Sequence, residues 1–296
     1  MNKFWKKTGW TCLTILPCII SLVIQILMGV VLGIILSVII AMTPELLNDA
    51  AAAEQFFLES TTKYNGIIIF AYHLISVPAF GLWYYLGCGR HKLTNPLPYF
   101  KEKTLPVTIL LSISLCFFAN AFVLVGQYVA PAAIESYMEL MEAAGLGVDA
   151  FAIIASIFLA PIGEEIVCRG ITYHYAKKIV ADMNNHRVAF WIANTLQAVM
   201  FGVMHANLVQ GLYAFLLGLG LGWLRERYNN LYPAVLAHAI INFSSTYVVG
   251  YPISLLPENI LSYLLLMVAS IAVIGAAIYM GKDSENNNEN SQTVAS

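Results

Sequence analysis

The sequence has few charged residues. Asp, Glu, Lys and Arg together make up 11% of its 296 residues, whereas 59% are hydrophobic. Soluble globular domains carry about 25% charged residues. This shortage of charge excludes an ordinary soluble domain and indicates an integral membrane protein. Nucleic-acid binding is not expected either, because the sequence contains no cluster of basic residues with interleaved aromatics.

Cysteine is also scarce, and its pattern excludes several kinds of site. No C-x-x-C pair occurs, so neither a redox pair nor a zinc ribbon is predicted. The number is odd and most of the cysteines lie in apolar segments, where they are expected to be small buried hydrophobes. Cys168, beside Arg169, is a weak candidate nucleophile because no histidine partner is evident in the sequence. The five are Cys12, Cys18, Cys88, Cys116 and Cys168.

The sequence does have a series of long apolar runs. A helix needs about 20 apolar residues to cross a bilayer, and the first run is too long for the apolar core of a cleaved signal peptide. The fold is therefore expected to be an all-α polytopic transmembrane bundle, with a disordered polar tail at 281–296. We predict eight spans, at 8–42, 65–86, 106–129, 150–173, 188–206, 208–224, 231–249 and 260–280.

The connecting segments alternate in charge. Acidic residues are concentrated in 43–64 and 130–149. Basic residues are concentrated in 1–7, 87–105 and 174–187, and at Arg225 and Arg227. Cytoplasmic segments carry the excess of Lys and Arg. We therefore predict a multi-pass protein of the cell membrane, with both termini in the cytoplasm.

Three ionisable residues interrupt the fourth span, in the stretch Pro161-Ile-Gly-Glu-Glu-Ile-Val-Cys-Arg169. Each such residue at the centre of a membrane helix costs about 2.5–3.5 kcal/mol on insertion scales, and such residues mark functional sites by default. Glu165 and Arg169 are spaced i,i+4 and can form an ion pair on one helix face. Glu164 lies about 100° around the helix from Glu165, so the two carboxylates need not have the same partner.

The later spans supply further pairs at i,i+4 spacing, Phe201 with His205 and His238 with Asn242. These polar residues divide the chain into three N-terminal scaffold spans (1–149), a core (150–249) and a final span (250–280). Other polar residues are expected to be structural. Asn194, Gln197 and Asn207 would form interhelical hydrogen bonds, although Asn207 could also line a cavity. His73 in the second span would be a hydrogen-bonded structural histidine, Phe201 a packing residue, and His174 and His186 loop residues.

Together the three motifs carry a resemblance. Glu-Glu-x-x-x-Arg at Glu164, Glu165 and Arg169, Phe-x-x-x-His ending at His205, and His-x-x-x-Asn ending at Asn242 resemble the signature of the CAAX-protease and bacteriocin-processing (CPBP, or Abi) family of intramembrane endopeptidases. The resemblance covers about residues 150–245.

The resemblance implies a glutamate-activated water as the nucleophile. Glu164 would activate the water and His205 would help to hold it. Glu165 and His238 would form a supporting pair, and Asn242 would donate a hydrogen bond to the developing oxyanion. Arg169 would keep the neighbouring carboxylate ionised and the fourth helix oriented. The implied substrates are bacteriocin or signalling-peptide precursors, or the tail of a membrane protein. Self-immunity to bacteriocins is another role in the family.

Two alternatives remain open from the sequence. No cofactor is expected, but two glutamates and two histidines are also a plausible zinc shell, with Glu164, His205 and His238 as ligands. No H-E-x-x-H motif supports it. The second alternative is a non-proteolytic scaffold or an ion-coupled transporter, because buried carboxylate–histidine sets also serve as proton relays. The absence of an evident internal repeat argues against a transporter.

Overall fold

The computed structural model describes residues 3–88, 104–143 and 149–294, with side chains from Phe4 to Lys282 within these ranges. No strand occurs among the described residues, which confirms the all-α prediction. Within the described ranges, three π-helical segments interrupt the α-helices. In chain order the elements are α1 (Lys3–Met42), α2 (Pro44–Leu47), α3 (Ala50–Trp83), η1 (Tyr84–Cys88), α4 (Thr104–Val129), α5 (Pro131–Ala143), α6 (Ala150–Ile154), η3 (Ala155–Leu159), α7 (Ala160–Glu165), η4 (Ile166–Thr172), α8 (Tyr173–Ile179), α9 (His186–Val203), α10 (Leu208–Arg227), α11 (Tyr232–Tyr247), α12 (Gly250–Ser254) and α13 (Ile260–Val294).

Six segments of the described chain are long and apolar enough to cross a membrane, as expected for a multi-pass membrane protein. They are Phe4–Met42, Ala50–Cys88, Thr104–Val129, Ala150–Ile179, Leu208–Arg227 and Ile260–Lys282. The fifth and seventh predicted spans are helices too, α9 and α11, but they are not among the six. α11 has only 16 residues, and α9 carries Asn194 and Gln197 in its interior. The total of eight spans stays a prediction.

Two connecting segments that the sequence predicts as loops are helical. α3 begins at Ala50, well before the predicted span, and the Asp49 carboxylate caps it by accepting two backbone N–H bonds. α5 fills most of the acidic segment between the third and fourth spans. Hydropathy indicates where a helix enters lipid but not where the helix ends, so these polar extensions were missed. Most of the predicted basic segment, residues 89–103, lies outside the described residues.

The C-terminal segment also differs from the prediction. α13 continues as a helix to Val294, through residues predicted to form a disordered tail. No glycine or proline follows Gly281 in this segment, so no helix-breaking residue interrupts the backbone.

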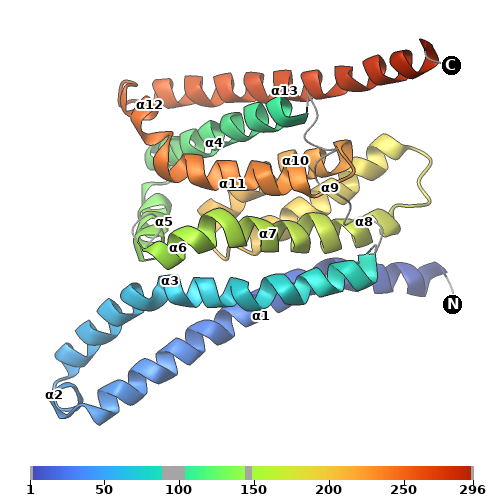
Figure 1. Cartoon of the computed structure of the whole chain (residues 1–296). Helices are drawn as coiled ribbons and strands as arrows, with labels where there is room; N and C mark the ends of the chain where they lie inside the picture. Colours follow the sequence, from blue (N-terminus) through green and yellow to red (C-terminus); the bar gives the residue numbers. More distant parts are fainter. Residues whose placement is uncertain (1–2, 89–103, 144–148, 295–296) are drawn as a thin grey trace.

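The core of residues 150–247 lies between two layers of the remaining helices (Figure 1). α1 and α3, joined by α2, pack together on one side. α13 packs along α4 on the opposite side. The segments from α6 to α11 lie between these layers, so the motifs of the fourth, fifth and seventh spans meet inside the bundle.

The charged ends of the helices are segregated in space. The start of α1, the end of α8 and the end of α13 lie at one end of the bundle, and α2 and α5 lie at the other (Figure 1). α8 and α10 carry Lys177, Lys178, Arg225 and Arg227 in their last turns. α2 and α5 carry acidic residues and no Lys or Arg. This separation agrees with the alternation of charge in the sequence.

α9 and α10 approach closely because glycines of α10 face polar side chains of α9. A Cβ atom at Gly222 would overlap the Oδ1 atom of Asn194. Asn194 Nδ2 donates to the Leu219 carbonyl at 3.1 Å, and Gln197 Nε2 donates to the Gly218 carbonyl at 2.9 Å. The predicted interhelical role of Asn194 and Gln197 is confirmed.

Candidate active site

The two adjacent glutamates lie at the end of the short α-helix α7, where the π-helix η4 begins. π-helical turns occur frequently at functional sites. The two side chains point in different directions, as consecutive residues on a helix must. The Glu165 side chain is fully buried, whereas that of Glu164 is 19% exposed. Of the two carboxylates, only that of Glu164 therefore has exposed surface.

Glu165 belongs to a buried network of charged side chains. Arg169 Nη1 donates to Glu165 Oε1 at 2.9 Å, and both side chains are completely buried. His238 Nδ1 lies 2.9 Å from the same oxygen. Because a carboxylate that is paired with arginine accepts hydrogen bonds only, Nδ1 of His238 carries the proton. The predicted pairs of Glu165 with Arg169 and with His238 are both present.

His238 also connects the two glutamates. Its second ring nitrogen, Nε2, lies 3.7 Å from Glu164 Oε2. This distance exceeds that of a hydrogen bond, but it is short enough for a charge–dipole or ion-pair interaction. Although Glu164 and Glu165 diverge around the helix, opposite nitrogens of one imidazole face their carboxylates.

Phe201 lies at the centre of the cluster. Its ring centroid is 4.9 Å from the ring of His205 and 5.6 Å from the ring of His238, both in edge-to-face geometry. The Arg169 guanidinium carbon lies 4.2 Å from the same centroid, a cation–π contact. Phe201 thus has the packing role predicted for it, and it fixes the relative positions of three polar side chains.

His205 lies beyond the end of α9, in the turn that leads to α10. The prediction had placed it inside the fifth span. Its Nδ1 atom is 2.8 Å from the Phe201 carbonyl oxygen, which can only accept, so Nδ1 is the donor and Nε2 has a free lone pair in the neutral ring. Ala206 follows with φ of 51°, a left-handed conformation that turns the chain. Asn207 then caps α10 by accepting from Gln210 N–H at 3.0 Å, a structural role.

Asn242 is anchored to the fourth span. Its Nδ2 atom donates to the Ser156 carbonyl at 2.8 Å. Ser156 lies in the π-helix η3, where the altered backbone pattern makes a carbonyl available to a side chain. One of the two amide N–H bonds is used in this contact, and the oxyanion contact of Asn242 stays a prediction.

His73 lies near the site, although the sequence predicts only a structural role for it. It is only 4% exposed, and its Nδ1 atom has no hydrogen-bond partner among the described residues, in contrast to the predicted structural histidine. A Cβ atom on Gly163, the residue before Glu164, would lie 3.5 Å from this nitrogen. His73 also interacts electrostatically with Glu164 and His238. The available signal was that His73 is the single His, Asp, Glu, Lys or Arg within the predicted second span.

Other candidate groups lie outside the cluster. Within the described ranges, no group of three or more His, Cys, Asp or Glu side chains is arranged to hold a metal ion. None of the five cysteines forms a disulfide with another described residue, and Cys168 is buried with its Sγ atom 3.5 Å from Met204 Sδ. His174 and His186 line a separate cavity near the ends of α8 and α10.

The comparisons with known proteins bear on the same part of the chain. Residues 147–244 match a family model described as type II CAAX prenyl endopeptidase Rce1-like. No curated protein and no solved structure matches the chain. The matched segment contains all three motifs. Over this segment the match supports the family that the motifs indicated, a family of hydrolases that act on peptide bonds.

Proposed function

We propose that this chain cleaves a peptide bond with a water molecule that Glu164 activates. The proposal rests on the match of residues 147–244 to the Rce1-like CAAX-type endopeptidases. One observation carries the assignment of the base. Of the two adjacent glutamates, Glu164 is partly exposed, and Glu165 is fully buried between Arg169 and His238. A general base must lie within hydrogen-bond reach of the proton that it abstracts.

The proposed reaction has two proton transfers. Glu164 takes a proton from the water as its oxygen attacks the carbonyl carbon of the scissile bond. The protonated carboxyl then gives the proton to the leaving amine as the carbon–nitrogen bond breaks. His205 helps to hold the water through its free Nε2 atom. Asn242 donates its remaining amide N–H to the oxyanion of the tetrahedral intermediate, where such a donor has its largest effect.

The other members of the cluster position these groups. Glu165 accepts the Nδ1 proton of His238 at 2.9 Å and so fixes the orientation of the imidazole. The Nε2 atom of His238 consequently faces the proposed base at 3.7 Å. Arg169 balances the buried charge of Glu165. In this assignment Glu165 and Arg169 act through His238 and do not touch the substrate.

The substrate and the membrane orientation are part of the proposal. The substrate is a peptide precursor, such as a bacteriocin, or the tail of a membrane-associated protein, and self-immunity to bacteriocins is an associated role. The basic ends of α8 and α10 lie on the cytoplasmic side of the cell membrane by the positive-inside rule, and the site opens toward that side.

The test uses the full-length protein in liposomes and a quenched fluorescent peptide that ends in a farnesylated Cys-a-a-X sequence. The same peptide without farnesyl is assayed in parallel. Loss of a general base typically lowers the rate by about 10²–10⁴-fold, so Glu164→Gln is expected to remove measurable cleavage. Glu139→Gln, an exposed glutamate of α5, is the control and is expected to retain it. Full activity of correctly inserted Glu164→Gln protein would refute the mechanism.

A cellular experiment separates the protease from a scaffold. Membrane peptides from cells with the wild-type protein and with Glu164→Gln protein are compared by mass spectrometry. A protease predicts a precursor that accumulates in the variant. If the Glu164→Gln protein instead rescues the phenotype of a deletion strain, the function is non-catalytic.

A further inference from the structure

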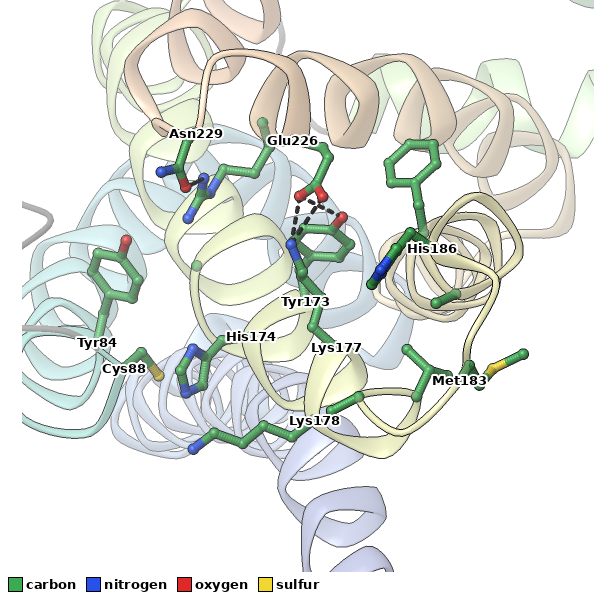
Figure 2. Close-up of a pocket in the computed structure, with 16 residues that line it drawn as sticks. Tyr84, Cys88, Tyr173, His174, Lys177, Lys178, Met183, His186, Glu226 and Asn229 are labelled. Carbon is green, nitrogen blue, oxygen red and sulfur yellow. Dashed lines mark hydrogen bonds and ion pairs between the residues drawn. The ribbon is translucent and has the colours of Figure 1, made fainter.

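A cavity of about 410 Å³ lies at the basic end of the bundle, separate from the proposed catalytic cluster (Figure 2). Its walls come from η1, η4, α8, the start of α9 and the end of α10. A single water occupies about 30 Å³ of liquid volume, so the cavity has room for a small organic group. None of Glu164, Glu165, His205 and His238 lines it.

The single carboxylate that the described residues contribute to the cavity wall is already neutralised. Glu226 accepts hydrogen bonds from Lys177 Nζ at 2.9 and 2.8 Å and from the Tyr173 hydroxyl at 3.0 Å (Figure 2). Lys177 forms its ion pair with Glu226. This pair therefore adds little net charge to the cavity.

Two further cations line the cavity without an acidic partner in the part of the chain that the structure describes. No carboxylate among the described residues lies within ion-pair distance of Arg225 or Lys178. Lys178 lies over the ring of Tyr175 at 5.1 Å and points away from Glu226 (Figure 2). The lining therefore carries an excess of positive charge.

Arg225 is the more informative of the two. A cation in the last turn of a helix complements the helix dipole, and at a membrane surface its long side chain usually extends toward water. Arg225 does not follow this pattern, because it is only 7% exposed. Its Nη1 atom has a long contact of 3.5 Å to Asn229 Oδ1, and its buried Nε atom has no hydrogen-bond partner among the described residues. A buried guanidinium donor without a partner is costly unless a ligand accepts from it.

The rest of the lining is apolar. Val180, Met183 and Phe190 border the cavity together with the cations. A ligand that fits this surface has an anionic group and an apolar part. Basic pockets between membrane helices on the cytoplasmic side are sites for phospholipid headgroups.

We propose that this cavity binds the phosphate group of an anionic phospholipid. Arg225 donates hydrogen bonds to the phosphate oxygens, and Lys178 adds positive charge at the site. The apolar residues contact the part of the lipid next to the phosphate. The site is independent of the catalytic cluster, and bound lipid would hold the ends of α8 and α10 together at the membrane surface.

The test measures thermal unfolding of the purified full-length protein in detergent with three ligands: dioctanoyl phosphatidylglycerol, dioctanoyl phosphatidylcholine and inorganic phosphate. We expect phosphatidylglycerol to raise the unfolding temperature in a saturable manner and the other two to have little effect. Arg225→Gln is expected to weaken phosphatidylglycerol binding by at least about 10-fold, the loss of a charge-assisted hydrogen bond. Lys178→Gln removes a cation and is expected to weaken it by about 5-fold.

The control is Lys6→Gln, because Lys6 is an exposed lysine in α1 outside the cavity lining, and this variant is expected to bind as the wild type does. If Arg225→Gln does not fold, Lys178→Gln decides the outcome. Any of three results would overturn the proposal. Phosphatidylcholine could raise the unfolding temperature as much as phosphatidylglycerol does, folded Arg225→Gln or Lys178→Gln protein could bind phosphatidylglycerol as the wild type does, or Lys6→Gln could weaken binding as much as the cavity variants do. A shift with inorganic phosphate that depends on Arg225 would retain the anion site but overturn the lipid as its ligand.

Discussion

The buried ion pair of Arg169 and Glu165 predicts an unusual order of stabilities, in which a variant that lacks both charges is more stable than a variant that lacks one. Both side chains have no exposed surface, and they are joined by one contact of 2.9 Å. Glu165 Oε2 and the Nε and Nη2 atoms of Arg169 have no hydrogen-bond partner among the described residues. A pair with so few other contacts gains little over an apolar replacement, but removal of one partner leaves an uncompensated buried charge.

The single variants Arg169→Met and Glu165→Gln should therefore each be destabilised by about 3–5 kcal/mol. The double variant should be more stable than either single variant, although it carries both changes. In the double variant no charge remains unbalanced, the amide oxygen at position 165 can still accept from His238, and the methionine thioether can contact the ring of Phe201.

The assay is equilibrium unfolding in mixed micelles with increasing SDS, applied to the wild type, the two single variants and the double variant. Lys7→Met is the control. It breaks the partly exposed Lys7–Asp182 pair, whose side chains are 37% and 38% exposed, and should cost at most about 1 kcal/mol. If the two single effects add to within about 0.5 kcal/mol in the double variant, the inference of an uncompensated buried charge is refuted.

Three further predictions concern packing, the amide and metal dependence. Gly222→Ala should destabilise the protein by about 1–3 kcal/mol in the same unfolding assay, because the new methyl group would overlap Asn194. The control Gly275→Ala should not destabilise it, because its methyl group would meet open space. Asn242→Ala should cost about 1–3 kcal/mol, because it leaves the Ser156 carbonyl without its donor, and it should also lower kcat; an unchanged kcat would remove Asn242 from the proposed oxyanion contact. Cleavage of the fluorescent peptide should be insensitive to a chelator, whereas inhibition that added zinc reverses would establish the zinc alternative.

The sequence was sufficient for the fold class and for the ion pair of the fourth span, whereas the catalytic roles stay predictions. Charge scarcity and long apolar runs require helices in a bilayer, and the i,i+4 spacing required Glu165 and Arg169 to share a helix face. The structure agrees on both points. The contact between Glu165 and His238 joins residues 73 positions apart, so no local pattern in the sequence predicts it. Only the family resemblance implied it.

The helix ends and the backbone irregularities could not be predicted. Polar extensions such as the first part of α3 have no apolar periodicity to mark them, and π-helical turns such as η4 have no composition signal of their own. The position of His205 also depended on a turn, because Ala206 adopts a positive φ that alanine rarely takes. The different exposure of Glu164 and Glu165 follows from tertiary packing, which the sequence of the fourth span does not contain.

The difference in exposure between two neighbouring glutamates matches the two different roles that the proposed mechanism gives them. A base needs access to water, and access requires a side chain that is incompletely covered. An orienting carboxylate needs a fixed position, and here Arg169 and complete burial fix Glu165. Glu164 and Glu165 are connected in two ways. They are consecutive residues of α7, and the ring of His238 lies between their carboxylates. In the proposed mechanism, the buried ion pair therefore acts on the reaction through the orientation of an imidazole, even though the pair itself adds little to stability.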